Sequence, residues 1–197
     1  MSKLVHLKYD DPAPDVVVKT VSGQKIHLAT LWKDHPIILA FTRHFGCAQC
    51  KEMLYEMIQL QGEIEKTGLR IVAVTQGDSA ETAEFAQQFA KGIPCYADPQ
   101  REAYRAYGLE QGNAVQLILS PQVLAGTAKA KKHGFNPELP PQGQDVRQMS
   151  GTFIIGTDGR IRLPYYYDTI ADHPPIDLLL KGVLSTDWNK PFKGPLA

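Results

Sequence analysis

Two cysteines separated by two residues, Cys47 and Cys50, are the side chains of this sequence best suited to chemistry. They follow a continuous apolar segment, residues 37–42, and open a segment in which apolar residues recur at helical spacing. A cysteine in the first turn of a helix ionises more readily, because the unpaired backbone N–H groups there favour negative charge. This placement predicts an exposed, nucleophilic Cys47 and a sheltered Cys50 that can close into a disulfide with it.

Three cationic side chains lie near this pair and are candidate stabilisers of a thiolate. Arg43 and His44 come just before Cys47, and Lys51 comes one turn after it. We include Arg43 and His44 among the candidate catalytic residues. The alternatives are a surface ion pair for Arg43 and simple packing under a loop for His44, and packing is the favoured interpretation of the histidine.

Other interpretations of the cysteines stay open. A C-x-x-C pair is also half of many zinc sites, and the two cysteines could instead be inert buried thiols, but both alternatives are less favoured than a redox-active pair. No second C-x-x-C and no H-x-x-x-H supplies further metal ligands, although Cys95 and a histidine could complete a set. We expect no metal and no bound cofactor, and we interpret Cys95 as a buried thiol beneath the sheet edge rather than a second resolving cysteine.

The elements that must position the pair follow from the periodicity of the chain. A β-hairpin, a βαβα segment and a second hairpin predict a mixed sheet with helices on both faces, which is the thioredoxin-type layout. Asp172 is expected to cap the last helix. Strands are expected over residues 16–19, 25–28, 37–42, 69–75, 93–96, 151–156 and 160–163, and helices over 47–66, 79–92, 101–107 and 176–183.

Residues 113–149 do not belong to that minimal layout. They contain an expected helix over residues 120–132 and then a loop rich in Pro and Gly over residues 134–143. A long loop in a compact domain is often functional, so an active-site cover and a surface appendage are both open. We therefore expect one domain over residues 1–197, with this insertion and a loosely held tail from about residue 186.

Composition limits the classes of partner. The 197 residues are 43% hydrophobic, which is enough for one sizeable core, and 21 Lys and Arg balance 21 Asp and Glu. This neutrality gives no reason to expect a nucleic acid or an anionic membrane as partner. No apolar run is long enough to span a bilayer, and the first residues do not resemble a secretory signal. We expect a cytoplasmic protein with reduced cysteines.

The segment over residues 41–52 resembles the AhpC/TSA antioxidant family, and in particular its atypical peroxiredoxin-like branch, in which a C-x-x-C replaces the single peroxidatic cysteine. Residues 96–109 and 151–159 resemble further segments of peroxiredoxins, and residues 172–175 and the helical insertion also look like this branch. The resemblance covers about residues 12–185. It implies an α/β thioredoxin-like fold, a mixed β-sheet flanked by helices with a helical insertion before the C-terminal hairpin.

The sequence departs from the family pattern at three positions. Peroxiredoxins carry a proline and a threonine seven and three residues before the peroxidatic cysteine, where this chain has Ala40 and His44. In the family, that threonine binds and orients the peroxide oxygen. The arginine that normally precedes the hairpin strand is Ser150 here, which leaves Arg147 and Arg43 as candidate substitutes.

Three functions stay open. In a thiol peroxidase, Cys47 attacks a peroxide and becomes a sulfenic acid, Cys50 condenses with it, and an external thiol such as thioredoxin or glutathione resets the pair. In a disulfide or small-molecule reductase, which includes the reduction of an endoperoxide lipid that part of the family is thought to perform, the same pair acts without a peroxide pocket. The third is a redox-inactive binding module on the same fold. Separately from the function, an interface through the exposed edge of the hairpin would give a homodimer.

Overall fold

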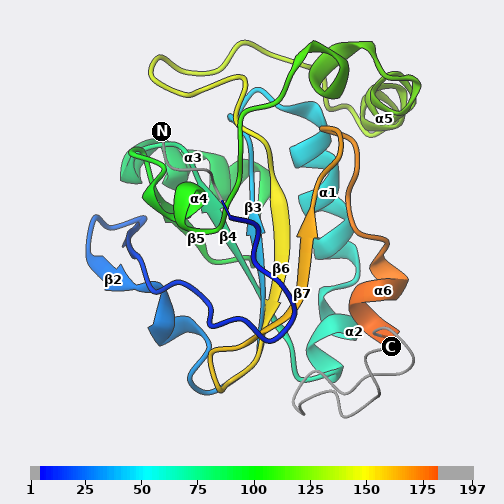
Figure 1. The fold of residues 1–197 in the computed structure, drawn as a ribbon. Coiled ribbons are helices and arrows are strands. Elements are labelled where there is room, and N and C mark those ends of the chain that lie inside the picture. The colour runs from blue at the N-terminus through cyan, green and yellow to red at the C-terminus, as the bar shows by residue number, and fades with distance from the viewer. Residues whose placement is uncertain (1–4, 182–197) are drawn as a thin grey trace.

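A mixed sheet forms the centre of the computed structural model, which describes residues 5–181 (Figure 1). Within those residues the strand order is β2-β1-β5-β4-β3-β6-β7. The neighbours β3, β4 and β5 run parallel, whereas β1 pairs antiparallel with β5 and β6 pairs antiparallel with β3. The strands are β1 (Val17–Thr20), β2 (Lys25–His27), β3 (Ile37–Phe41), β4 (Arg70–Thr75), β5 (Cys95–Ala97), β6 (Gly151–Ile155) and β7 (Ile161–Tyr166).

Helices cover both faces of this sheet. Side chains of β3 alternate between two buried clusters, so that Ile38 packs with α1 and α3, whereas Leu39 packs with Tyr104 of α4. This arrangement confirms the predicted thioredoxin-like fold. The helices are α1 (Ala48–Gln59), α2 (Gln61–Lys66), α3 (Ser79–Phe89), α4 (Glu102–Ala106), α5 (Pro121–Lys132) and α6 (Ile176–Lys181), with short helical turns η1 (Leu28–Leu31) and η2 (Val115–Leu119).

Three predicted details were wrong. The helix expected over residues 47–66 is broken at Leu60, whose φ of −110° and ψ of 10° are not helical, and Gly62 lowers helix propensity just beyond the break. The helix expected from residue 101 begins at Glu102, because Arg101 has a left-handed backbone with a φ of 56° and a ψ of 36°, and the carboxylate of Asp98 accepts the first N–H groups of the helix. Asp172 does not cap α6, because it accepts hydrogen bonds from Tyr165 and Asp168 instead.

The insertion lies at the end of the sheet where β3 leads into α1 (Figure 1). Ser120 caps α5 as predicted, by accepting the backbone N–H of Val123 at 3.1 Å. The expected tail and the end of the expected last helix lie outside the described residues. No helix within residues 5–181 is long and apolar enough to cross a membrane.

Candidate active site

The two cysteines meet at the junction of β3 and α1. Cys47 is the N-cap residue of α1, and its Sγ accepts the backbone N–H of Cys50 at 3.3 Å. The two Sγ atoms lie 2.8 Å apart, with the Cys50 thiol donating to Cys47. Their sulfur atoms are thus already close enough to form a disulfide without movement of the backbone.

Arg43 lies against this pair and is fixed from several sides. Its Nη1 is 3.6 Å from the Cys47 Sγ, and its Nε donates to the carbonyl of Gln148 at 3.0 Å. Its Nη2 donates to the carbonyl of Val146. The residue is only 4% exposed and pairs with no carboxylate among residues 5–181, in place of the surface ion pair considered for it. A guanidinium held in this way places a fixed positive charge beside Cys47.

The two thiols have opposite acidities. Burial raises the pKa of Cys47, but the hydrogen bonds from Cys50 and the charge of Arg43 outweigh it and lower the pKa to about 6. Burial raises the pKa of Cys50 well above its usual value, and its hydrogen bond to Cys47 adds to the increase. Near neutral pH, Cys47 is therefore the thiolate and Cys50 carries the proton.

Cys47 is nevertheless not exposed, and this part of the prediction was wrong. Its exposed fraction is 3%, compared with 1% for Cys50. The reason is the insertion, whose Glu138 donates its backbone N–H to the carbonyl of Gly46 at 2.9 Å, directly before the cysteine. Of the two interpretations of the loop, an active-site cover is therefore the one that this contact favours.

A cavity of about 420 Å³ leads to Cys47 between the junction and the insertion. Arg43 and Cys47 line one side, together with His44 and Gln49. The opposite wall is largely apolar and comes from η2, α5 and the loop that follows them. Its apolar side chains include Leu117, Ile118, Val123, Leu124, Pro137 and Val146.

His44 and Lys51, the other candidate cations, do not assist the thiolate by charge. Burial, together with the charges of Arg43 and Lys51, lowers the pKa of His44 to about 4, so its imidazole is neutral at pH 7. Lys51 is buried, and its Nζ pairs with Glu138 at 2.8 Å and lies 4.3 Å from the centre of the Phe89 ring. Lys51 therefore binds the insertion through Glu138 and does not stabilise the Cys47 thiolate.

Of the two arginines considered as substitutes for the family arginine, only Arg43 contacts Cys47. Arg147 is exposed, and its Nε donates to the carbonyl of Gly112 at 3.4 Å. Ser150 is buried, and its Oγ has no hydrogen-bond partner among the described residues. Arg43 thus reaches the sulfur from the β3 side of the site instead of from the β6 side.

Cys95 is separate from the site. It is 5% exposed, its thiol points to the carbonyl of Ile93 at 3.5 Å, and burial raises its pKa to about 12. Its strand, β5, lies between β1 and β4 rather than at the sheet edge. Within residues 5–181, no group of three or more His, Cys, Asp or Glu side chains is placed to hold a metal ion.

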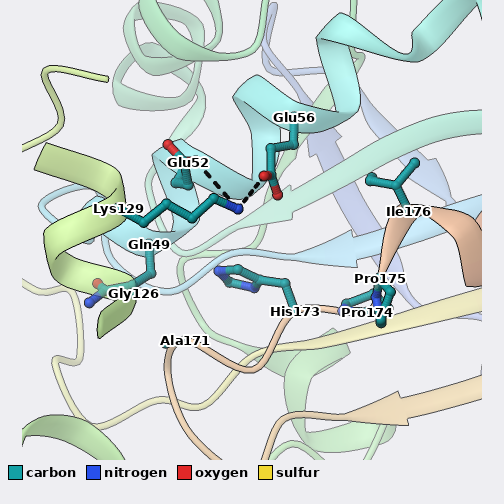
Figure 2. A pocket seen from close by; sticks show the side chains of 10 residues that line it. All are labelled: Gln49, Glu52, Glu56, Gly126, Lys129, Ala171, His173, Pro174, Pro175 and Ile176. Atoms are coloured by element: carbon teal, nitrogen blue, oxygen red, sulfur yellow. Dashed lines mark hydrogen bonds and ion pairs between the residues drawn. The ribbon is translucent and has the colours of Figure 1, made fainter. Parts of the chain in front are cut away.

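A second cavity of about 290 Å³ lies behind the site, between α1, α5 and the loop before α6 (Figure 2). His173 lines this second cavity and not the one that contains Cys47. Lys129 of α5 pairs there with Glu52 and Glu56 of α1. These ion pairs join the insertion to the helix that carries the cysteines.

Gln49, between the two cysteines, was missed from the sequence as a site residue. Its Oε1 lies 3.8 Å from the Cys47 Sγ, and its Nε2 donates to Oγ1 of Thr127 at 2.6 Å. Its position inside the C-x-x-C segment could have indicated a site residue, because the first turn of the helix faces the cavity that leads to Cys47. Nothing in the sequence indicated Thr127, because its contact with Gln49 depends on how α5 packs against α1.

The chain is similar to curated proteins along most of its length. It is 27% identical over 177 residues to a prostamide/prostaglandin F synthase of Salmo salar, a match that covers 87% of this chain and 86% of the relative. It is 22% identical to the peroxiredoxin-like 2C protein of Bos taurus, over 88% of this chain and 80% of that one. These similarities support an oxidoreductase.

The solved structures agree on the fold. The crystal structure of the peroxidoxin BcpB from Mycobacterium tuberculosis superposes with a TM-score of 0.60 at 19% identity, and covers 89% of this chain and 95% of that one. The sequence profile of the AhpC/TSA family matches residues 9–163, which contain the cysteine pair, Arg43 and the insertion. The chain therefore belongs to the AhpC/TSA family.

Proposed function

We propose that this protein is a thiol peroxidase that reduces hydrogen peroxide or organic hydroperoxides. The Cys47 thiolate attacks one peroxide oxygen, the O–O bond breaks, and the other oxygen leaves as water or an alcohol after taking up a proton. The resulting Cys47 sulfenic acid condenses with the Cys50 thiol, which releases water and forms the Cys47–Cys50 disulfide.

The observation that carries this proposal is the environment of the Cys47 Sγ. A pKa of about 6 makes Cys47 a thiolate at neutral pH, and Arg43 lies 3.6 Å away with a charge that can stabilise the leaving oxygen. The protonated Cys50 thiol, 2.8 Å away, is already in position to resolve a sulfenic acid. A peroxidase cycle that ends in a disulfide within one chain uses all three features.

The proposal includes an external thiol reductant, because reduction of the disulfide consumes two electrons that the chain does not supply. Thioredoxin or glutathione are the candidate reductants, and no bound cofactor is required. A reducing compartment such as the cytoplasm suits this cycle. A homodimer is compatible with it, since both cysteines act within one chain.

A second candidate is reduction of an apolar lipid peroxide or endoperoxide by the same pair. It is favoured by the apolar wall of the cavity, from Leu117 to Val146, and by relatives that are called prostamide/prostaglandin F synthases. Cleavage of an endoperoxide by two thiols would give two hydroxyl groups and the Cys47–Cys50 disulfide. The reductant would then be the same.

The reaction of the reduced protein with hydrogen peroxide tests the proposed function. We expect a second-order rate constant at least about a hundredfold above that of a free thiol, and a product with one Cys47–Cys50 disulfide by peptide mass spectrometry. In Cys50→Ser the same first step should stop at a Cys47 sulfenic acid, which dimedone traps. A free-thiol rate with hydrogen peroxide and with an alkyl hydroperoxide would reject the proposal and leave the endoperoxide candidate.

A further inference from the structure

Gln49 is a buried amide that faces the reacting sulfur and has no role in the steps above. It is 4% exposed and lines the cavity that leads to Cys47. Its Oε1 lies 3.8 Å from the Cys47 Sγ, within reach of a weak hydrogen bond from the thiol. Once Cys47 is ionised, that oxygen is a free acceptor beside the nucleophile.

Thr127 of the insertion determines which end of the amide faces Cys47. The Thr127 hydroxyl donates its hydrogen to the carbonyl of Val123 at 2.8 Å, so its oxygen can only accept from Gln49. The Gln49 Nε2 supplies that hydrogen at 2.6 Å, which turns Oε1 towards the sulfur. Figure 2 shows Gln49 extending from α1 towards Gly126, the residue before Thr127 on α5.

We propose that Gln49 binds the hydroxyl group of the peroxide, and that Thr127 is a positioning residue that acts through Gln49. The inference rests on the proposed peroxidase function and deepens it. It answers a problem raised by the sequence, because His44 stands where the family threonine orients the peroxide. The neutral, buried imidazole of His44 has no hydroxyl to offer, whereas the Gln49 Oε1 offers a hydrogen-bond acceptor 3.8 Å from the sulfur.

The distances allow one oxygen atom to meet both groups. A hydrogen-bonded oxygen lies about 2.8 Å from its acceptor, and a reacting oxygen lies about 3.3 Å from a nucleophile before attack. These two separations close a triangle with the 3.8 Å between Gln49 Oε1 and Cys47 Sγ. The acceptor would thus hold the O–H of the peroxide while the sulfur attacks that same oxygen.

The step is balanced with the groups present. The Cys47 thiolate forms the S–O bond as the O–O bond breaks, and the attacked oxygen keeps its hydrogen, which stays bonded to Gln49. The other oxygen leaves beside Arg43 and takes a proton from water. Sulfur is oxidised by two electrons, and the peroxide is reduced to one sulfenic hydroxyl and one water or alcohol.

If Gln49 binds the peroxide hydroxyl, its contribution to the reaction rate should depend on whether the substrate carries an O–H group. Hydrogen peroxide and alkyl hydroperoxides carry that hydrogen, whereas endoperoxides and alkylating reagents do not. The loss of the Gln49 acceptor should therefore slow reactions with hydroperoxides and leave alkylation of Cys47 nearly unchanged. A residue that merely supports the packing of α1 would affect both reactions together.

Three variants test this inference, each measured with hydrogen peroxide and with iodoacetamide. Gln49→Met keeps the length of the side chain without the acceptor, and we expect its peroxide rate to fall about tenfold or more, with alkylation within about threefold. Thr127→Val keeps the shape without the hydroxyl and should lose about threefold to tenfold. Thr127→Ser keeps the hydroxyl and should recover most of that loss.

The outcomes separate this inference from the proposed function. If the unmodified protein reacts with peroxide only as fast as a free thiol, the proposed function fails and this inference fails with it. If the unmodified protein is fast and Gln49→Met is equally fast, only the role of Gln49 is overturned. An equal loss of both rates in Gln49→Met, or an equal loss in Thr127→Val and Thr127→Ser, also overturns it. If Gln49→Met does not fold, the Thr127 pair still decides.

Discussion

Two regions of the molecule meet at the site, and they contribute in different ways. The junction of β3 and α1 carries both sulfur atoms and Arg43 within a few residues of one another. The insertion over residues 113–149 carries none of the reacting atoms. It buries Cys47, accepts two hydrogen bonds from the Arg43 side chain and binds the amide of Gln49.

The difference shows that the chemistry and its environment have separate origins in this fold. A C-x-x-C at a helix start can supply a nucleophile and a resolving thiol from local sequence alone. The fixed charge beside Cys47 and its apolar cavity arise only when the insertion folds over the junction. Variants that remove a reacting group or charge of the junction should therefore change chemical steps directly, whereas variants that alter the insertion or its contacts should act through access, stability or the positioning of junction side chains.

The largest effect is expected from removing the nucleophile. Cys47→Ser should lower the rate of peroxide reduction at least about a thousandfold, because a serine hydroxyl does not ionise near neutral pH. Cys95→Ser is the matched control, since that thiol lies in β5 away from the site. Stopped-flow measurement of peroxide consumption checks both variants. If Cys95→Ser were as inactive as Cys47→Ser, the assignment of the nucleophile would be wrong.

A smaller but still large effect is expected from Arg43. In Arg43→Met the positive charge beside the sulfur is lost while burial remains, so the pKa of Cys47 should rise above its value of about 6. At pH 7 we expect alkylation of Cys47 by iodoacetamide to slow at least about tenfold. Arg147→Met removes an exposed arginine of the insertion and should alkylate like the unmodified protein. Equal rates for the two variants would contradict the role of Arg43.

The contact between the two regions can be broken at Gly46. A Cβ at this position would lie 2.0 Å from the carbonyl oxygen of Glu138, so Gly46→Ala must displace the insertion loop. We expect a loss of about 1–3 kcal/mol in the free energy of unfolding and faster alkylation of Cys47, because its cover opens.

Gly62→Ala is the control for that substitution. It lies in α2 with nothing within 4 Å of its Cβ position, and it should raise the free energy of unfolding by about 0.5–1 kcal/mol. Urea denaturation measures both changes. A stable Gly46→Ala with an unchanged alkylation rate would show that the loop does not cover Cys47.

The smallest effect is expected at the ion pairs between α5 and α1. Lys129 is about half exposed and pairs with Glu56, and Glu52 keeps His133 as a second partner. Lys129→Met should therefore lower the free energy of unfolding by less than about 1 kcal/mol. Urea denaturation at low and high salt measures it, and a loss above about 2 kcal/mol would mean that these ion pairs, rather than apolar packing, hold the insertion.

The same contrast explains how far the sequence could predict the molecule. The mixed sheet, the junction and the proximity of Cys47 and Cys50 follow from local periodicity, and the structure confirms them. The burial of Cys47 could not be predicted in this way, because its cover comes from the insertion. Lys51 pairs with Glu138, which lies 87 residues further along the chain, and Gln49 bonds to Thr127, which lies 78 residues further along. Pairings at such separations leave no periodic pattern in either segment.

The cations near the cysteines show the same limit within a short segment. The sequence gives no reason to prefer one of the three candidate cations, because each lies within four residues of Cys47. They are Arg43, His44 and Lys51. Only Arg43 points to the sulfur, because its other nitrogens bond to carbonyls of the insertion. His44 is neutral through burial, and Lys51 turns to Glu138. Distance along the chain did not distinguish these three outcomes.

The assignment of Cys47 as the thiolate nucleophile is tested most directly by the pH dependence of alkylation of the reduced protein, with the modified cysteine identified by peptide mass spectrometry. We expect that Cys47 is modified first, that its rate falls about tenfold per pH unit below a midpoint of about 6, and that Cys50 and Cys95 stay unmodified across this range. A midpoint near the ordinary thiol value of about 8.5, or earlier modification of another cysteine, would contradict it.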